Sequence, residues 1–215
     1  MEPIRRHRAG SPSPSVGPAG THPSGEALPV YPPREDSLLL AKFAVVPRGT
    51  LFLEVGAGSG EASLVAARCG ARVVATDLNP HALRRLVSKA RADGLELSVV
   101  RTDLAHGLGR FDRVLANPPY LPTRPEERDP DRWHNLALDG GPDGCRVTAR
   151  LVDGLADHLT ARGEAFVVVS SLQHPKGLDR IRSGWVRSGG TVEEVHSRDF
   201  EGERLAVWRF ARSRR

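Results

Sequence analysis

Residues 53–63 read LEVGAGSGEAS, an apolar strand-like run followed by a glycine-rich turn and the start of a helix-like segment. Glycine has no Cβ, so such a turn can adopt positive φ and let the backbone come close to a ligand. The free N–H groups at the start of the following helix add hydrogen-bond donors. The third glycine of the dinucleotide motif G-x-G-x-x-G would fall at residue 61, which is Glu61. The stretch therefore predicts a nucleotide-binding unit without the dinucleotide fingerprint, the alternative being a tight connection only.

Strand-like and helix-like segments alternate on both sides of this unit. Strands are predicted at 50–55, 71–77, 95–103, 111–116 and 163–171, helices at 35–46, 61–70, 79–94, 143–161 and 175–189, and a closing hairpin at 191–200 and 204–210. Val- and Leu-rich strands alternating with helices are typical of an α/β fold with a parallel sheet covered on both faces. Residues 121–142 are predicted to be a long polar loop. In such folds ligands bind beyond the carboxyl ends of the strands.

The charge of the chain lies at its two ends. The formal net charge is +5, of which residues 1–30 contribute +1 and residues 209–215 contribute +4. Residues 31–208 are therefore neutral overall, which argues against a nucleic-acid partner, although a neutral body can still carry a basic face. The composition predicts a disordered Pro-, Ser- and Gly-rich tail at 1–29, one domain at 30–211 and a basic tail at 212–215.

Other classes of protein find little support in the sequence. No apolar run reaches the roughly 18 residues that a membrane helix needs. The basic residues at the start are not followed by the apolar segment of a secretory signal. Cys69 and Cys145 form neither a disulfide framework nor a metal-binding spacing. We therefore expect a cytoplasmic protein with no membrane partner and no metal.

Three acidic positions at predicted strand ends suggest a nucleoside joined to an amino acid. Asp77 follows Gly56 by 21 residues, which suits a carboxylate that accepts from ribose hydroxyls, although it could also cap the next helix. Asp103 and the apolar Leu104 suit an adenine amino group and ring, although Asp103 could be a turn residue. Glu54 could meet an ammonium group or be a partly buried strand acid. Together these residues fit S-adenosylmethionine better than NAD.

Residues 117–120 read Asn-Pro-Pro-Tyr and directly follow the fourth predicted strand. The Asn117 side-chain carbonyl and the Pro118 backbone carbonyl can both accept from one NH₂ group. The rigid Pro118–Pro119 pair would fix these acceptors, and Tyr120 would cover a planar group. Holding both N–H bonds turns the nitrogen lone pair towards a methyl donor, so the motif predicts in-line methyl transfer to an amide or exocyclic amine. A simple proline loop stop is the alternative.

At this point the chain resembles the HemK-like protein-glutamine methyltransferases, a branch of the class I methyltransferases. The resemblance spans about residues 30–211. Asn-Pro-Pro-Tyr also occurs in adenine-N6 and guanine-N2 methyltransferases of DNA and RNA, so the other motifs favour the HemK-like group. The motifs are VYPPREDSLLL (30–40), LEVGAGSGEAS (53–63), ATDLNPHAL (75–83), NPPY (117–120) and ALDGGPDGCRV (137–147).

The resemblance implies a fold and a set of cofactor-binding residues. The fold is a Rossmann-like, mostly parallel sheet of seven strands in the order 3-2-1-4-5-7-6, with one antiparallel hairpin strand and helices on both faces. Glu54 and the glycine turn would hold methionine, Asp77 the ribose and Asp103–Leu104 the adenine. The whole implied S-adenosylmethionine site is Ser37, Glu54, Gly56, Ala57, Gly58, Asp77, Leu78, Asp103, Leu104 and Asn117.

Two further parts of the site are implied in the same way. Ser37 and its acidic neighbours Glu35 and Asp36 would line the cofactor. The amide that accepts the methyl group would be held by Asn117 and Pro118, and the implied catalytic set is Asn117, Pro118, Pro119 and Tyr120.

The family's usual substrate is the glutamine of the Gly-Gly-Gln motif in translation release factors. Larger bacterial members carry a helical N-terminal domain that docks the release factor, and the tail at 1–29 cannot replace it. The chain looks like the short archaeal and eukaryotic-type branch, in which some members use a small zinc-binding partner on the third strand. Here the third strand contains LELSVV (95–100), which permits such pairing or could be an ordinary buried strand.

Three alternative functions remain open at this stage. A base methyltransferase acting on RNA or DNA would need room for a flipped base and contacts to the backbone. A nucleotide-dependent oxidoreductase conflicts with Glu61 in the glycine turn. A protein that only senses S-adenosylmethionine would not need the intact motif at 117–120.

Overall fold

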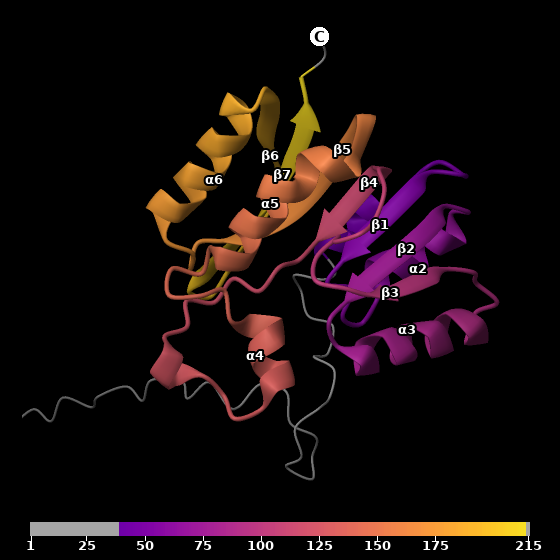
Figure 1. Cartoon of the computed structure of the whole chain (residues 1–215), viewed down its shortest axis with the longest axis horizontal. Helices are drawn as coiled ribbons and strands as arrows, with labels where there is room; N and C mark the ends of the chain where they lie inside the picture. The colour runs from indigo at the N-terminus through magenta and orange to yellow at the C-terminus, as the bar shows by residue number, and fades with distance from the viewer. Residues whose placement is uncertain (1–38, 214–215) are drawn as a thin grey trace, which may run out of the picture.

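The structure is a computed structural model that describes residues 39–213. Its centre is one seven-stranded sheet in the order β3-β2-β1-β4-β5-β7-β6 (Figure 1). The pairs β3–β2, β2–β1, β1–β4 and β4–β5 are parallel, and β7 is antiparallel to both β5 and β6. The strands are β1 (Leu51–Val55), β2 (Arg72–Asp77), β3 (Ser98–Arg101), β4 (Phe111–Ala116), β5 (Leu159–Ser170), β6 (Gly190–Phe200) and β7 (Glu203–Arg212). The predicted fold and strand order are confirmed.

Helices pack on both faces of the sheet, because the apolar side chains of each strand alternate between its two faces. On β1, Leu53 and Val55 join the core under α5 (Arg146–His158) and α6 (Pro175–Arg187). On the other face, Phe52 joins the core formed with α2 (Glu61–Arg68) and residues 39–46. Helix α3 (Pro80–Ala92) packs beside α2 through Leu86 and Ala90.

Two segments near the site differ from the predictions. Residues 121–142 were predicted to be a loop but contain a 3-10 helix, η2 (Pro125–Glu127), and the helix α4 (Arg132–Leu138). No residue of α4 is fully buried; Trp133, Leu136 and Ala137 are half-buried and stand at helical spacing, but a run of seven residues is too short to mark a helix in the sequence. A side-chain cap adds support, since Asp131 accepts from the N–H of Trp133 at 2.8 Å.

Other boundaries shift by a few residues. The first predicted helix is described only from residue 39, where one helical turn leads into η1 (Lys42–Ala44). Strand β3 is shorter than predicted, and β5 begins at Leu159, where the preceding helix was expected to continue. Strand β7 includes Arg212, whose guanidinium donates to the carbonyl of Ala156. The predicted tail at 1–29 lies outside the described residues.

Strand β3 forms one edge of the sheet. Ser98 and Arg101 are exposed and Val99 and Val100 are half-buried, so the alternative of an ordinary buried strand is wrong. Among residues 39–213, no helix is long and apolar enough to cross a membrane.

Candidate active site

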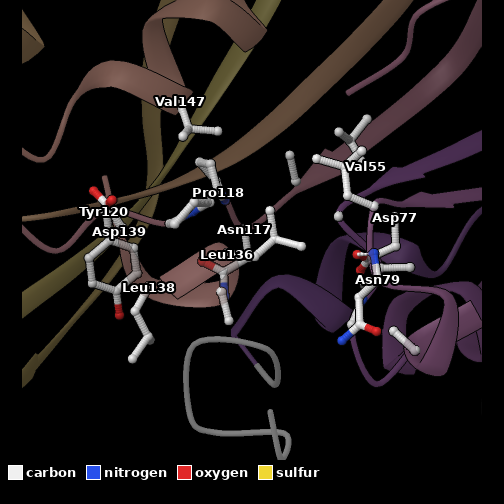
Figure 2. Close-up of a pocket in the computed structure, with 18 of the residues that line it drawn as sticks. Val55, Asp77, Asn79, Asn117, Pro118, Tyr120, Leu136, Leu138, Asp139 and Val147 are labelled. Carbon is white, nitrogen blue, oxygen red and sulfur yellow. Dashed lines mark hydrogen bonds between the residues drawn. The ribbon is translucent and has the colours of Figure 1, made fainter. Parts of the chain in front are cut away.

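A cavity of about 890 Å³ opens at the carboxyl ends of the central parallel strands. This size lies within the range of small-molecule sites, which is about 300–1,000 Å³. The glycine turn and the ends of β2 and β3 line one part of the cavity, and residues 117–121 and the segment around Asp139 line another. Figure 2 shows Asn117 and Pro118 between Asp77 and Asn79 on one side and Tyr120 and Asp139 on the other. The cavity therefore has two ends joined at the Asn-Pro-Pro-Tyr motif.

The glycine turn takes the backbone conformation that its composition predicts. Gly56 and Gly58 have φ of 68° and 51° and line the cavity, so their bare backbone faces the space where a ligand would lie. Gly60, with φ of 76°, is the N-cap of α2. A Cβ on Gly60 would lie 2.3 Å from the Leu86 side chain, so this glycine allows α2 to pack closely on α3.

Asp77 lines the cavity and also fixes the glycine turn. Its Oδ2 accepts from the N–H of Gly58 at 2.9 Å, and its Oδ1 accepts from the N–H of Asn79 at 2.8 Å. Burial raises the pKa of Asp77, and these hydrogen bonds oppose that rise. The N-cap of α3 is Asn79, whose side chain accepts from the N–H of His81 at 2.9 Å. The alternative role of Asp77 as the helix cap is therefore wrong.

Glu54 is a buried carboxyl group at the end of β1 that lines the same end of the cavity. Its Oε2 accepts from the N–H of Ser63 at 2.8 Å and from the Ser63 hydroxyl. Burial raises the pKa of Glu54 to about 7, more than the hydrogen bonds from Ser63 lower it. A cation bound beside this carboxyl group would favour its ionised form.

Asp103 and Leu104 lie after β3 and also line the cavity. Asp103 forms an ion pair with Arg150 of α5, with 2.5 Å between Oδ2 and Nη2, and both side chains are about half exposed. Leu104 has φ of 52°, unusual for a residue with a side chain, and its carbonyl accepts from Thr76 Oγ1 at 2.8 Å. Thr76 thus ties this bend to β2, next to Asp77. Arg150 was not predicted, because its ion pair joins residues far apart in the sequence.

The four residues of the Asn-Pro-Pro-Tyr motif all line the cavity. Strand β4 ends at Ala116, so the motif begins directly at the carboxyl edge of the sheet. Asn117 is half-buried, and Tyr120 packs against the core cluster on the α2 face. The predicted cofactor residues Ala57 and Leu78 line the cavity as well, and Leu78 is 38% exposed. Ser37, Glu35 and Asp36 lie outside the described residues.

The stretch Gly140–Gly144 packs against the backbone of Tyr120, the last residue of the Asn-Pro-Pro-Tyr motif. Leu121 and Asp139 form a parallel bridge, in which the N–H of Gly140 donates to the Leu121 carbonyl at 2.9 Å. A Cβ on Gly144 would lie 2.4 Å from the Tyr120 carbonyl oxygen, and one on Gly140 would lie 2.8 Å from the Tyr120 carbonyl carbon. The glycines therefore let the two segments meet backbone to backbone. In the sequence, the stretch 140–144 stood out only through the family resemblance, and no role was predicted for it.

Asp139 is the buried centre of an ion cluster at the Tyr120 end of the cavity. Its Oδ2 accepts from Arg128 Nε at 2.9 Å, and its Oδ1 lies 3.0 Å from Arg146 Nη2. Burial alone would raise the pKa of Asp139, but the hydrogen bonds from Gly141, Arg146 and Arg128 lower it below its usual value. Asp139 therefore stays ionised at neutral pH. Sequence reasoning had no signal for this cluster.

Helix α4 forms a further wall of the cavity and touches α3. The Trp133 ring meets the His81 ring edge to face, with 5.7 Å between centroids and 80° between planes. The Arg132 guanidinium lies 3.9 Å from the centre of the Trp133 ring. This contact links the segment after the Asn-Pro-Pro-Tyr motif to the helix that follows Asp77.

Comparisons with known proteins agree with this geometry. Residues 52–130 match the family model described as a methyltransferase domain. A putative protein N5-glutamine methyltransferase of Methanocaldococcus jannaschii is 38% identical over 68% of this chain and 75% of its own length. The mouse methyltransferase HEMK2 is 33% identical over 94% of this chain and 97% of its own length. A release factor glutamine methyltransferase of Deinococcus radiodurans is 37% identical, but the match covers only 50% of that protein.

A solved structure extends the agreement to three dimensions. The Mtq2-Trm112 complex of E. cuniculi, described as responsible for methylation of the eRF1 translation termination factor, contains a chain that superposes with a TM-score of 0.65. That chain is 26% identical, and the match covers 86% of this chain and all of that one. The cavity with its glycine turn and Asn-Pro-Pro-Tyr motif, together with these relatives, shows that the chain belongs to the short branch of the HemK-like methyltransferases.

Proposed function

We propose that this protein transfers a methyl group from S-adenosylmethionine to the side-chain amide nitrogen of a protein glutamine. The proposed substrate is the glutamine of the Gly-Gly-Gln loop in a translation release factor. The observation that carries the proposal is a single cavity that joins the Glu54–Asp77 end to the Asn-Pro-Pro-Tyr end. Relatives named for glutamine methylation support the choice of acceptor.

The donor groups at the first end fit the cofactor. Burial raises the pKa of the Glu54 carboxyl group to about 7, because among the described residues no positive charge offsets the loss of hydration. The ammonium group of the methionine part would supply that positive charge. Both oxygens of Asp77 accept from backbone N–H groups, and because an ionised carboxylate has about four lone pairs it can also accept from ribose hydroxyls. Leu104 and Leu78 offer apolar surface for the nucleoside, and Asp103 can accept from the adenine amino group.

The second end fits an amide. When bound, S-adenosylmethionine supplies a methyl group activated by its sulfonium. The Asn117 side-chain carbonyl and the Pro118 carbonyl would each accept one N–H of the glutamine amide, and as the N–CH₃ bond forms and the S–CH₃ bond breaks, one of these two protons would pass to solvent. This arrangement stops the nitrogen lone pair from delocalising fully into the carbonyl and directs it towards the methyl group. The prolines hold the two acceptors before the substrate arrives, so little reorganisation is needed during transfer.

The direct test compares protein and nucleic-acid acceptors in one experiment. The purified chain is incubated with labelled S-adenosylmethionine and the release factor of its own organism, beside total RNA and DNA. Mass spectrometry is expected to find one added methyl group on the Gly-Gly-Gln glutamine. Methyladenine or methylguanine in the nucleoside digest, with an unmodified glutamine, would instead establish the base methyltransferase that the same motif permits.

We also propose a small zinc-binding partner subunit at the β3 edge of the sheet. The edge backbone of Ser98–Arg101 is not covered by another strand of the described chain, and such edges readily accept a further strand. The similar E. cuniculi chain is named as part of a complex with Trm112. Co-expression with the organism's own Trm112-like protein is expected to yield a stable, zinc-containing heterodimer. Full activity and solubility of the chain alone, with no association, would contradict the proposal.

A further inference from the structure

The ion cluster around Asp139 leaves most of its hydrogen-bond donors unused. Arg128 donates to Asp139 through Nε, which leaves the four N–H bonds of its two Nη atoms. Arg146 uses Nη2 on the Oδ1 and carbonyl oxygen of Asp139. Within residues 39–213, the hydrogen bonds of these two arginines run through Arg128 Nε and Arg146 Nη2. Both arginine side chains are nearly half exposed, at 48% and 45%.

The cluster lies beside the acceptor end of the cavity. Asp139 forms a backbone bridge with Leu121, the residue directly after Tyr120. Arg128, Arg146 and Asp139 line the cavity together with Tyr120. Figure 2 places Asp139 next to Tyr120, with Asn117 between this end and Asp77. A polypeptide that delivers a side chain to Asn117 from the Tyr120 end would therefore meet a wall that carries the two guanidinium groups.

The charge of the cluster suits oxygen acceptors. Two guanidinium groups and one ionised carboxylate give a local net charge of +1, and Arg can only donate hydrogen bonds. Asp139 pairs with Arg128 Nε and Arg146 Nη2, and because each guanidinium is planar, this pairing fixes the direction of the remaining N–H bonds. Arginines held in this way favour carboxylate and carbonyl oxygens with defined geometry.

We propose that Arg128 and Arg146, positioned by Asp139, form a docking rim for the polypeptide that carries the methylated glutamine. The rim donates hydrogen bonds to oxygens within a few residues of that glutamine, either side-chain carboxylates or main-chain carbonyls. In a Gly-Gly-Gln loop the glycine carbonyls lack neighbouring side chains and are open to such donors. This inference rests on the proposed function, because it assigns the rim to a polypeptide acceptor.

The test separates substrate binding from chemistry and from cofactor binding. Arg128→Gln is expected to raise KM for the release factor about tenfold, the lower range for losing a charge-assisted hydrogen bond. The value of kcat should stay within about threefold and S-adenosylmethionine affinity should be unchanged, because Arg128 touches neither Asn117 nor the Asp77 end. Arg128→Lys should give an intermediate KM, since it keeps the charge but cannot bridge Asp139 and the substrate at once.

Arg68→Gln is the matched control. Arg68 is also about half exposed and also pairs with an aspartate, Asp93, but it does not line the cavity. The Arg68→Gln variant should leave both KM for the release factor and kcat unchanged. A KM for Arg128→Gln equal to that of the wild type would overturn the inference. So would a parallel loss of S-adenosylmethionine affinity, which would make Arg128 only a support for the loop.

Release factor variants identify which oxygens the rim contacts. Acidic residues within three positions of the glutamine are changed to their amides. If carboxylates dock, these changes raise KM for the wild type and add nothing in Arg128→Gln. If main-chain carbonyls dock, KM for the wild type is unchanged while the effect of Arg128→Gln persists. A wild-type enzyme that leaves the glutamine unmethylated would overturn the proposed function and the rim together, whereas normal methylation by Arg128→Gln would overturn only the rim.

Discussion

The Asp77 carboxylate accepts a hydrogen bond from the backbone N–H of Gly58, with 2.9 Å between Oδ2 and N. The end of β2 thereby holds the glycine turn that follows β1, across a parallel strand pair. One side chain thus shapes the turn and presents its remaining lone pairs to the cavity. The two roles can be separated by mutation.

Asp77→Ala is expected to weaken S-adenosylmethionine binding by about 10- to 100-fold, because it removes charge-assisted hydrogen bonds worth roughly 1.5–3 kcal/mol. Asp77→Asn keeps an acceptor for Gly58 and should therefore keep more of the thermal stability while still losing affinity. Calorimetric titration and thermal unfolding of both variants measure the two effects. If Asp77→Ala bound S-adenosylmethionine as tightly as the wild type, the only role left for Asp77 would be to shape the glycine turn.

Asn117→Ala is expected to lower the rate of methyl transfer by about 10²–10³, as for the loss of one preorganised polar group. Affinity for S-adenosylmethionine should stay within a few-fold, because the side chain acts on the acceptor amide. Single-turnover rates and titrations on the same preparation provide the comparison. A parallel fall in rate and affinity would make Asn117 a cofactor ligand instead.

The raised pKa of Glu54 predicts two pH effects of opposite sign. In the free protein, folding favours the protonated carboxyl group, so its contribution to stability is present below about pH 4.5 and is lost as pH rises to about 7. Cofactor binding should release the proton, because the ammonium group favours the carboxylate. Affinity should therefore rise about tenfold per pH unit towards pH 7 and then level off.

Calorimetry at pH 6 in two buffers of different ionisation enthalpy measures this proton release directly. Glu54→Gln cannot titrate and is the control, so its binding should show no buffer dependence from this site. Equal heats in both buffers for the wild-type protein would argue against contact between Glu54 and the ammonium group.

Gly144→Ala is expected to displace the Asn-Pro-Pro-Tyr motif and so lower the rate of methyl transfer. The new Cβ would lie 2.4 Å from the Tyr120 carbonyl oxygen, at a residue whose φ is 70°. Displacement of the motif by about 1 Å can cost on the order of 10²-fold in rate. Gly154→Ala in α5 is the control, since nothing lies within 4 Å of its Cβ, and it should be neutral or slightly stabilising. Equal kcat in the two variants would show that the contact does not matter for catalysis.

The length of the acceptor side chain should also matter. A release factor in which the Gly-Gly-Gln glutamine is replaced by asparagine should not be methylated, because its nitrogen cannot reach the methyl donor while its NH₂ group meets Asn117 and Pro118. Binding of this variant to the enzyme should persist if the rim at Arg128 contacts neighbouring oxygens. Methylation of the asparagine at a similar rate would show that these acceptors do not fix the position of the amide.

The sequence predicted most of the fold because the apolar strands and the glycine turn follow local rules. Gly70 follows Cys69, the C-cap of α2, at the end of the helix predicted for 61–70, whereas the cap of α3 is Asn79 and not Asp77, the alternative that the sequence suggested. The strand order came from the resemblance, since periodicity does not say which strands are neighbours. Helix α4 was missed because its apolar residues span only seven positions within a mostly polar stretch, too few to establish a helical period.

The site was predicted in parts. Glu54, Asp77, Asp103 and the Asn-Pro-Pro-Tyr motif line one cavity, as expected for residues at the carboxyl ends of parallel strands. Arg150 and the pair Arg128–Arg146 were missed, because their carboxylate partners lie on other elements and only the folded chain brings them together. The roles of the individual residues in binding and catalysis stay predictions, including that of Ser37.

The bridge between Leu121 and Asp139 makes residues 122–138 a loop whose two ends are fastened at the same place. Because the proposed docking residue Arg128 lies in this loop, substitutions there would alter what the enzyme recognises while the fastened ends keep the methyl-accepting motif in position. On this proposal, related enzymes would diverge in their choice of target protein through this one segment, under selection separate from that acting on the chemistry. In this fold, residues that would select the target protein can change while the residues that would carry out methyl transfer stay the same.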